Sequence, residues 1–102
     1  MTVQGNGPPR QYRVVMSKQT ENRLKELHAK AAQTGTSHRF MAAFRAIMER
    51  LRTDPFVFGE PLYRLPSLKL MVRHAAIAPI AVAYAVHEDQ PLVFIRWFKV
   101  LS

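Results

Sequence analysis

After residue 17, the spacing of hydrophobic residues changes once, from a helical period to a strand period. Residues 37–53 place apolar side chains every three or four positions, which is the spacing of an amphipathic helix. These apolar positions are Phe40, Met41, Phe44, Ile47, Met48 and Leu51. From Gly59 onward, bulky residues alternate with small or polar ones at every second position, as in strands. The pattern predicts helices in the first half of the chain and a sheet in the second.

Another helix is predicted on the N-terminal side of residues 37–53, over the residues that follow Ser17. Ser17 or Thr20 can cap its N-terminus, and Gly35 can end it in a left-handed conformation. Its narrow apolar stripe consists of Leu24, Leu27 and Ala31. Because only a short turn near Gly35 separates the two helices, we expect them to form an antiparallel hairpin.

Four segments have the composition of strands. They are Gln11–Ser17, Leu68–His74, Pro79–Val86 and the last segment, Pro91–Ser102. In the third segment the bulky positions are Ile80, Val82, Tyr84 and Val86, and alanines occupy positions 81, 83 and 85. We expect the bulky face to pack on the helices and the alanine face to point away, toward solvent or a partner. In the second segment, Lys69 and Arg73 share one face, opposite Leu68 and Val72, and we expect this to be the exposed face that also carries the three alanines.

The last segment is apolar on both faces, which is typical of a strand inside a sheet. Arg96 and Lys99 interrupt it, and strict alternation places them on opposite faces, so that they cannot form one patch. Lys99 shares the face of Trp97. A buried Arg96 would require a partner, for which Glu60 and Glu88 are candidates.

The predicted order is strand, helix, helix, strand, strand, strand. We therefore expect an α+β fold, β-α-α-β-β-β, in which a helix hairpin packs on one face of a small, mainly antiparallel sheet. A length of 102 residues favours one domain. Residues 1–10 contain two glycines and two prolines and are expected to be a flexible tail, which leaves residues 11–102 as the domain.

Charge adds the first indication of a partner. Fifteen Lys and Arg residues oppose seven Asp and Glu residues, giving a net charge of +8, which favours nucleic acid or an acidic protein. The chain lacks cysteine, a leader-like segment and an apolar run of the roughly 20 residues that span a bilayer, so we expect a cytoplasmic protein without membrane contact. Metal-ligand spacing and a glycine-rich phosphate loop are also missing, so no metal or cofactor is expected.

Two longer stretches resemble a known family. "LRTDPFVFGEPLYRL", followed by "KLMVRHAAIAPIAVAYAVHEDQPLVFIRWFKV", is similar to the RelE/ParE superfamily, the toxins of type II toxin–antitoxin pairs, also described as plasmid stabilisation proteins. The resemblance implies an acidic antitoxin as partner. It also implies one of two targets: mRNA on the ribosome, which RelE-like members cut, or DNA gyrase, on which ParE-like members act.

The family's ribonuclease residues are matched only in part. Lys69 and Arg73 correspond to its basic strand, and His74 can exchange a proton near neutral pH. The arginine expected in the next strand falls near Ala81, and the acid, base or tyrosine expected after the last strand has no counterpart before Ser102. The catalytic candidates are thus Lys69, Arg73 and His74, the binding candidates are Lys69, Arg73 and Lys99, and whether the protein is an enzyme stays open.

The leading hypothesis is a RelE/ParE-like toxin that acts by binding its target, with weak or no ribonuclease activity. One alternative is a ribosome-dependent mRNA endoribonuclease with relocated catalytic residues. Another is a basic nucleic-acid-binding module without toxin activity. The sequence leaves the oligomeric state open, a dimer included.

Overall fold

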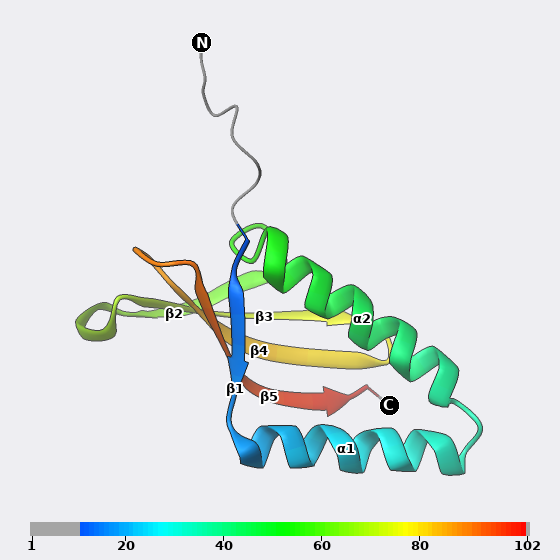
Figure 1. The fold of residues 1–102 in the computed structure, drawn as a ribbon. Coiled ribbons are helices and arrows are strands. Elements are labelled where there is room, and N and C mark those ends of the chain that lie inside the picture. Colours follow the sequence, from blue (N-terminus) through cyan, green and yellow to red (C-terminus); the bar gives the residue numbers. More distant parts are fainter. Residues whose placement is uncertain (1–10, 102) are drawn as a thin grey trace.

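The computed structural model describes residues 11–101 (Figure 1), so the tail predicted over residues 1–10 lies outside the described residues. The elements in chain order are β1 (Arg13–Met16), α1 (Lys18–Gln33), α2 (Ser37–Thr53), β2 (Glu60–Leu65), β3 (Leu70–Ile77), β4 (Ile80–His87) and β5 (Leu92–Val100). The α+β prediction is confirmed, with one strand more than expected.

The five strands form one sheet in the order β1-β5-β4-β3-β2. β1 runs parallel to β5, and the other neighbouring pairs are antiparallel. β5 has a neighbour on each side, as its two apolar faces predicted. β1 pairs with only the first part of β5, however, because the pairing ends where Met16 lies opposite Ile95.

The strand missed by the sequence pattern is β2, at the edge of the sheet. Its side chains are mostly exposed, and Pro61 lies at a register shift against β3, so the strand lacks the alternation of a half-buried strand. A 3₁₀ turn over Pro66–Leu68 leads to β3, which begins at Leu70 rather than at Leu68.

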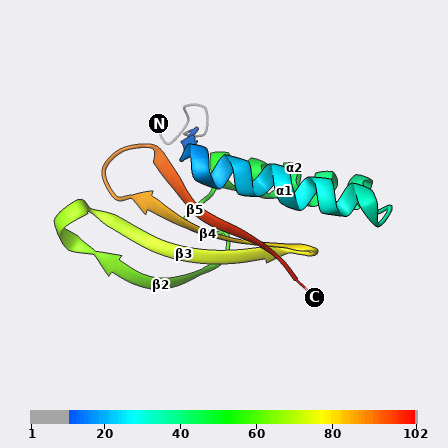
Figure 2. The same cartoon turned by 90° about the horizontal axis from the view of Figure 1, so that it is seen from below.

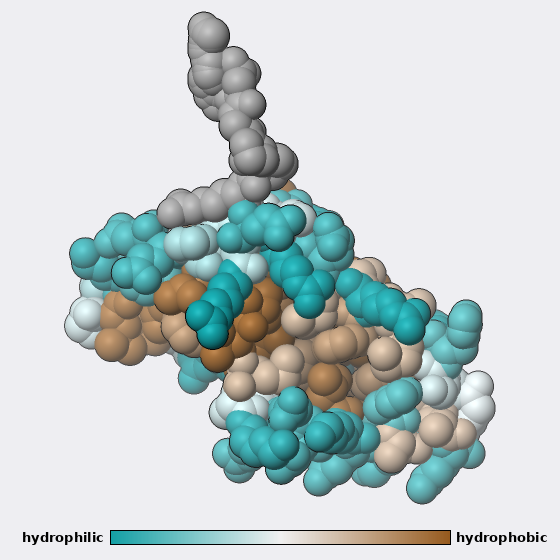
Figure 3. Space-filling view, in the orientation of Figure 1, coloured by the Kyte–Doolittle hydropathy of each residue, from teal (hydrophilic) through white to brown (hydrophobic). Residues whose placement is uncertain are grey.

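The two helices pack side by side on one face of the sheet (Figure 2), which we call the helix face. Ser17 caps α1, since its hydroxyl accepts the N–H of Thr20 at 3.1 Å, and Gly35 follows the helix with a φ of 74°. Ile80, Val82, Tyr84 and Val86 are fully buried beneath the helices. The predicted direction of the bulky face of β4 is therefore confirmed. Figure 3 shows hydrophobic side chains between the two helices and over the strand ends beside them.

A bulge in β5 reverses the alternation of its side chains. Tyr84 pairs with Ile95, but Ala83 pairs with Trp97, which leaves Arg96 as the extra residue. As a result, Phe98 is buried in the core under the helices, whereas Trp97 and Lys99 lie on the opposite side of the sheet. The strict alternation expected for this strand is wrong beyond Ile95.

In the part of the chain that the structure describes, no helix is both long and apolar enough to cross a membrane.

Candidate binding surface

The sheet has a second face, opposite the helices, which we call the open face. Three rows of paired residues cross it: Val72, Ala85 and Phe94; His74, Ala83 and Trp97; and Ala76, Ala81 and Lys99. Tyr63 of β2 pairs with Val72 and extends the first row. The alanines of β4 thus point away from the helices, as predicted, and form the floor of this face.

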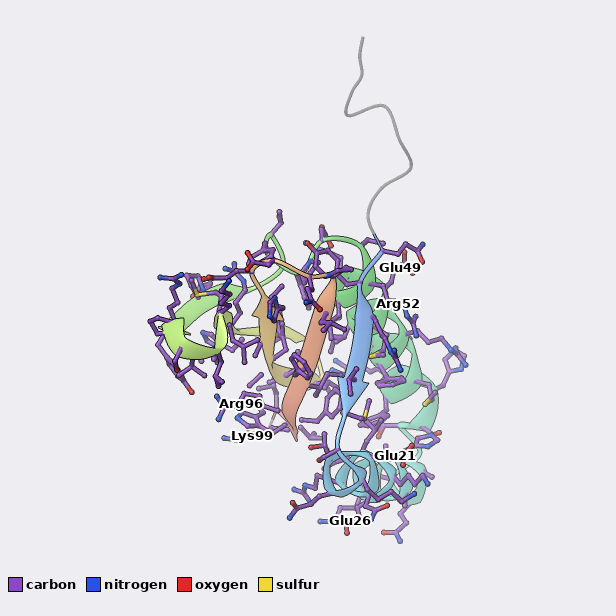
Figure 4. All side chains as sticks on the ribbon, turned by 60° about the vertical axis from the view of Figure 1, so that its left-hand side comes forward. Glu21, Glu26, Glu49, Arg52, Arg96 and Lys99 are labelled. Atoms are coloured by element: carbon purple, nitrogen blue, oxygen red, sulfur yellow. The ribbon has the colours of Figure 1, made fainter. Side chains whose placement is uncertain are left out.

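Two cations lie over this floor. Arg96 donates a hydrogen bond to the hydroxyl of Tyr63 at 2.6 Å, and the ammonium of Lys99 lies 4.7 Å from the ring centroid of Trp97. In Figure 4, Arg96 and Lys99 project in the same direction from the end of β5. The prediction that they cannot share a patch is wrong, because the bulge at Arg96 moves Lys99 to this side.

The aromatic rings beside these cations remain partly in contact with solvent. Trp97 is 37% exposed and Tyr63 is 48% exposed. Aromatic rings can stack on nucleic-acid bases, and neighbouring guanidinium and ammonium groups can neutralise phosphates. The arrangement therefore suits a planar, anionic ligand such as a single nucleic-acid strand.

Lys69 lies outside this surface, in the turn between β2 and β3. Its backbone is left-handed, with a φ of 55°, and its ammonium donates to Asp89 at 2.9 Å. This hydrogen bond raises the pKa of Lys69 and lowers that of Asp89. Arg64 and Glu88 form a second ion pair at the same end of the sheet. Arg96 itself is exposed, so the condition under which it would need Glu60 or Glu88 as a partner is not met.

Arg73 points to the helix face, where it is buried. Its guanidinium donates to the carbonyl oxygens of Phe58 at 3.3 Å and Gly59 at 3.1 Å. Phe58 and Gly59 belong to the α2–β2 link, residues 54–59. The hydroxyl of Tyr84 donates to the carbonyl of Pro55 in the same link at 2.9 Å, and burial raises the pKa of this hydroxyl. Arg73 thus holds the α2–β2 link. The expectation that Arg73 shares an exposed face with Lys69 is wrong.

His74 is exposed on the open face, opposite Ala83. The three catalytic candidates therefore lie in three places: Lys69 in a turn, Arg73 under the helices and His74 on the open face. Within residues 11–101, no group of three or more His, Asp or Glu side chains lies close enough together to hold a metal ion.

The sequence interpretation missed Tyr63 and Arg96 as members of one surface. Tyr63 belongs to the strand that was not predicted, and Arg96 was assigned to the face opposite Lys99. Trp97 and Lys99 were correctly placed on one face. The only sequence signal for the rest was the unusual position of Arg96 among aromatic residues in an otherwise apolar strand.

Comparison of the chain with protein-family models, with curated proteins and with solved structures finds no match.

Proposed function

We propose that this protein is a RelE/ParE-like toxin of a type II toxin–antitoxin pair, which acts in the cytoplasm by binding its target with the open face. The observation that carries the proposal is the patch formed by Tyr63, Arg96, Trp97 and Lys99 over the alanines of β4. The net charge of +8 supports an anionic target or an acidic antitoxin. The sequence resemblance supplies the assignment to a toxin family.

The positions of the catalytic candidates favour binding over cleavage. Cleavage of RNA requires a base, an acid and a cation within reach of one phosphate. Arg73 is buried and bonded to two carbonyl groups, and Lys69 is paired with Asp89. Neither can readily meet a phosphate beside His74, so we expect weak or no ribonuclease activity.

The chemistry of the open face also favours a second function, that of a module that binds single-stranded nucleic acid without being a toxin. Stacking of a base on an aromatic ring contributes about 1–3 kcal/mol and tolerates any sequence. Trp97 is the only tryptophan of the chain and lies in this patch. Its fluorescence can therefore report directly on a bound oligonucleotide.

The growth test uses two variants that remove the same number of cations. Arg96→Ala with Lys99→Ala changes the open face, whereas Arg45→Ala with Arg52→Ala changes exposed residues of α2. Each variant is induced in cells with and without the neighbouring open reading frame, and growth and mRNA integrity are measured. We expect wild type and the α2 variant to slow growth without the neighbour, and the open-face variant to be harmless.

Four results would contradict the toxin proposal or its site. If wild-type protein does not affect growth, the toxin proposal is contradicted. Quenching of the Trp97 fluorescence by a single-stranded oligonucleotide would then favour the nucleic-acid-binding module. Rapid loss of mRNA would favour the ribonuclease. Loss of toxicity only in the α2 variant would move the functional surface to the outer side of α2. Unchanged toxicity in both variants would remove the open face from the mechanism.

A further inference from the structure

Among residues 11–101, no strand lies beside the outer edge of β5 beyond Ile95. β1 pairs with residues 92–95 only, and β5 continues to Val100. The N–H of Leu101 donates to the carbonyl of Pro79, next to β4, at 2.7 Å. Because backbone groups of an antiparallel strand alternate in direction, those of Phe98 and Val100 point outward, away from β4.

The backbone carbonyl of the bulged residue, Arg96, already has a hydrogen-bond partner outside the sheet. The carbonyl of Arg96 accepts a hydrogen bond from the hydroxyl of Thr20 on α1 at 3.4 Å. In the described part of the chain, no strand pairs with the outward groups of Phe98 and Val100. An open strand edge of this kind is a template for the addition of another strand.

Two hollows follow this edge, between β5 and the helices. One, of about 530 Å³, lies beside Arg96, Trp97 and Phe98, and the other, of about 630 Å³, lies beside Lys99 and Val100. Arg23 of α1 lines both, so we treat them as one edge groove. The groove is therefore placed where a strand added to β5 would lie.

The lining of the groove defines the character of its occupant. Leu27, Ala31 and Phe40 give the second hollow an apolar floor. Among the described residues, its lining includes four cations and no acid: Arg23, Lys30, Arg39 and Lys99. In the part of the chain that the structure describes, the one acid that lines the first hollow, Glu26, is paired with Arg23 at 3.3 Å. An occupant that matches both features carries carboxylates and aliphatic side chains.

We propose that the edge groove binds an extended, acidic segment of a partner protein, which adds as a strand to the free edge of β5. Its backbone would pair with Phe98 and Val100, its carboxylates would meet the three cations of the helices, Arg23, Lys30 and Arg39, and its aliphatic side chains would cover the apolar floor. Residues 98–100 span about 7 Å, so a short segment of the partner suffices. Identification of this partner as the antitoxin rests on the proposed function, whereas the docking mode does not.

A second copy of this chain is a poorer occupant. Two protein edges that paired with each other would bring the same cations of both grooves together, and like charges oppose such contact. An acidic segment removes this repulsion. Charge complementarity therefore selects a partner of opposite sign.

The test uses a synthetic seven-residue peptide of alternating glutamate and valine, with a peptide of alternating lysine and valine as its control. Binding and hydrogen exchange are followed by NMR on the whole protein. Without peptide, we expect the amides of Phe98 and Val100 to exchange quickly and those of Trp97 and Lys99, which face β4, to be protected. The acidic peptide should protect Phe98 and Val100, and added salt should weaken its binding.

A pair of variants separates strand addition from simple charge attraction. Val100→Pro removes the outward N–H but leaves the bonds of β5 to β4, because proline is tolerated where its nitrogen faces away from the ladder. Val100→Thr keeps the N–H. We expect Val100→Pro to bind the acidic peptide about tenfold more weakly, the effect of one lost hydrogen bond, and Val100→Thr to bind it as wild type does.

Several results would overturn this proposal while leaving the proposed function intact. These are equal binding of Val100→Pro and Val100→Thr, equal binding of the lysine peptide, and no binding of the acidic peptide to wild type. Protection of Phe98 and Val100 in a peptide-free dimer would show that a second copy occupies the edge. Conversely, peptide binding as predicted in a protein that does not slow growth would contradict only the toxin assignment.

Discussion

The guanidinium of Arg96 donates a hydrogen bond to the hydroxyl of Tyr63, although β3 and β4 lie between their two strands. Three strand spacings of a flat sheet amount to about 14 Å, so both side chains must reach across the open face. Beneath them, Ala83 is 2% exposed and Ala85 is 3% exposed. The small side chains of β4 thus leave room for the hydrogen-bonded bridge between Arg96 and Tyr63, which lies over them.

The first prediction concerns this bridge. We expect Arg96→Ala and Tyr63→Phe each to lower the free energy of unfolding by about 0.5–1.5 kcal/mol, the usual net contribution of one hydrogen bond. The double variant should lose less than the sum, because either single change already removes the bond. Urea denaturation of the four proteins measures this coupling. Strictly additive losses would mean that the bond contributes nothing in solution.

Arg73 should be essential for stability rather than for target binding. Arg73→Ala removes the donor of the Gly59 carbonyl and one of the two donors of the Phe58 carbonyl, which also accepts from the hydroxyl of Tyr84, and this should cost about 1–3 kcal/mol. Arg73→Lys should restore only part of this loss, because an ammonium lacks the planar fork that reaches two carbonyls. Thermal unfolding measures stability, and quenching of Trp97 by an oligonucleotide measures binding. Loss of binding in a variant of unchanged stability would return Arg73 to the functional surface.

The sequence predicted the fold where local chemistry determines it. The cap at Ser17, the left-handed Gly35 and the direction of the bulky face of β4 all follow from short-range patterns. The alternation of β3 was also read correctly, but the face given to Arg73 was wrong. That face depends on the carbonyls of the α2–β2 link, which approach Arg73 only in the folded protein.

The candidate surface was less predictable because it depends on two irregular features. A bulge at Arg96 leaves no mark in the pattern of hydrophobic residues, yet it decides which side of β5 carries Lys99. β2 is an exposed edge strand, so little of its hydrophobic pattern is imposed by burial. Tyr63 and Arg96 could therefore be paired only after the register of the sheet was known.

Core packing gives the next prediction, a comparison of two positions in α2. Ile47 is fully buried, and Ile47→Ala should cost about 2–5 kcal/mol. The ring of Phe44 lies 6.0 Å from that of Phe98 but remains half-buried, so Phe44→Ala should cost less than Ile47→Ala. Chemical denaturation of both variants gives the order. If Phe44→Ala were the more damaging change, the ring would be the main anchor of the helices.

The ion pairs at the turns should weaken in acid. Hydrogen bonds from Arg64 and Lys69 lower the pKa values of Glu88 and Asp89, because they stabilise the carboxylates. A lowered pKa contributes stability above the unfolded-state values of about 4.3 and 3.9, and this contribution is lost as the pH falls through the lowered values. NMR titration of the carboxyl carbons measures both groups. Lys69→Met should return Asp89 to its ordinary pKa and change Glu88 less; an unchanged Asp89 would show that the pair is not formed in solution.

Gly59 and Gly35 provide a matched test of close packing at the α2–β2 link. Both have positive φ angles, 71° and 74°, so alanine at either position meets the same backbone strain, about 1–2 kcal/mol. At Gly35, no atom of the described residues lies within 4 Å of an added Cβ, whereas at Gly59 the carbonyl oxygen of His74 would lie 2.2 Å away. Gly59→Ala must therefore also displace β3 and disturb the bond from Arg73 to the Gly59 carbonyl. We expect its melting temperature to fall well below that of Gly35→Ala, and equal melting temperatures would mean that the link does not approach β3 this closely.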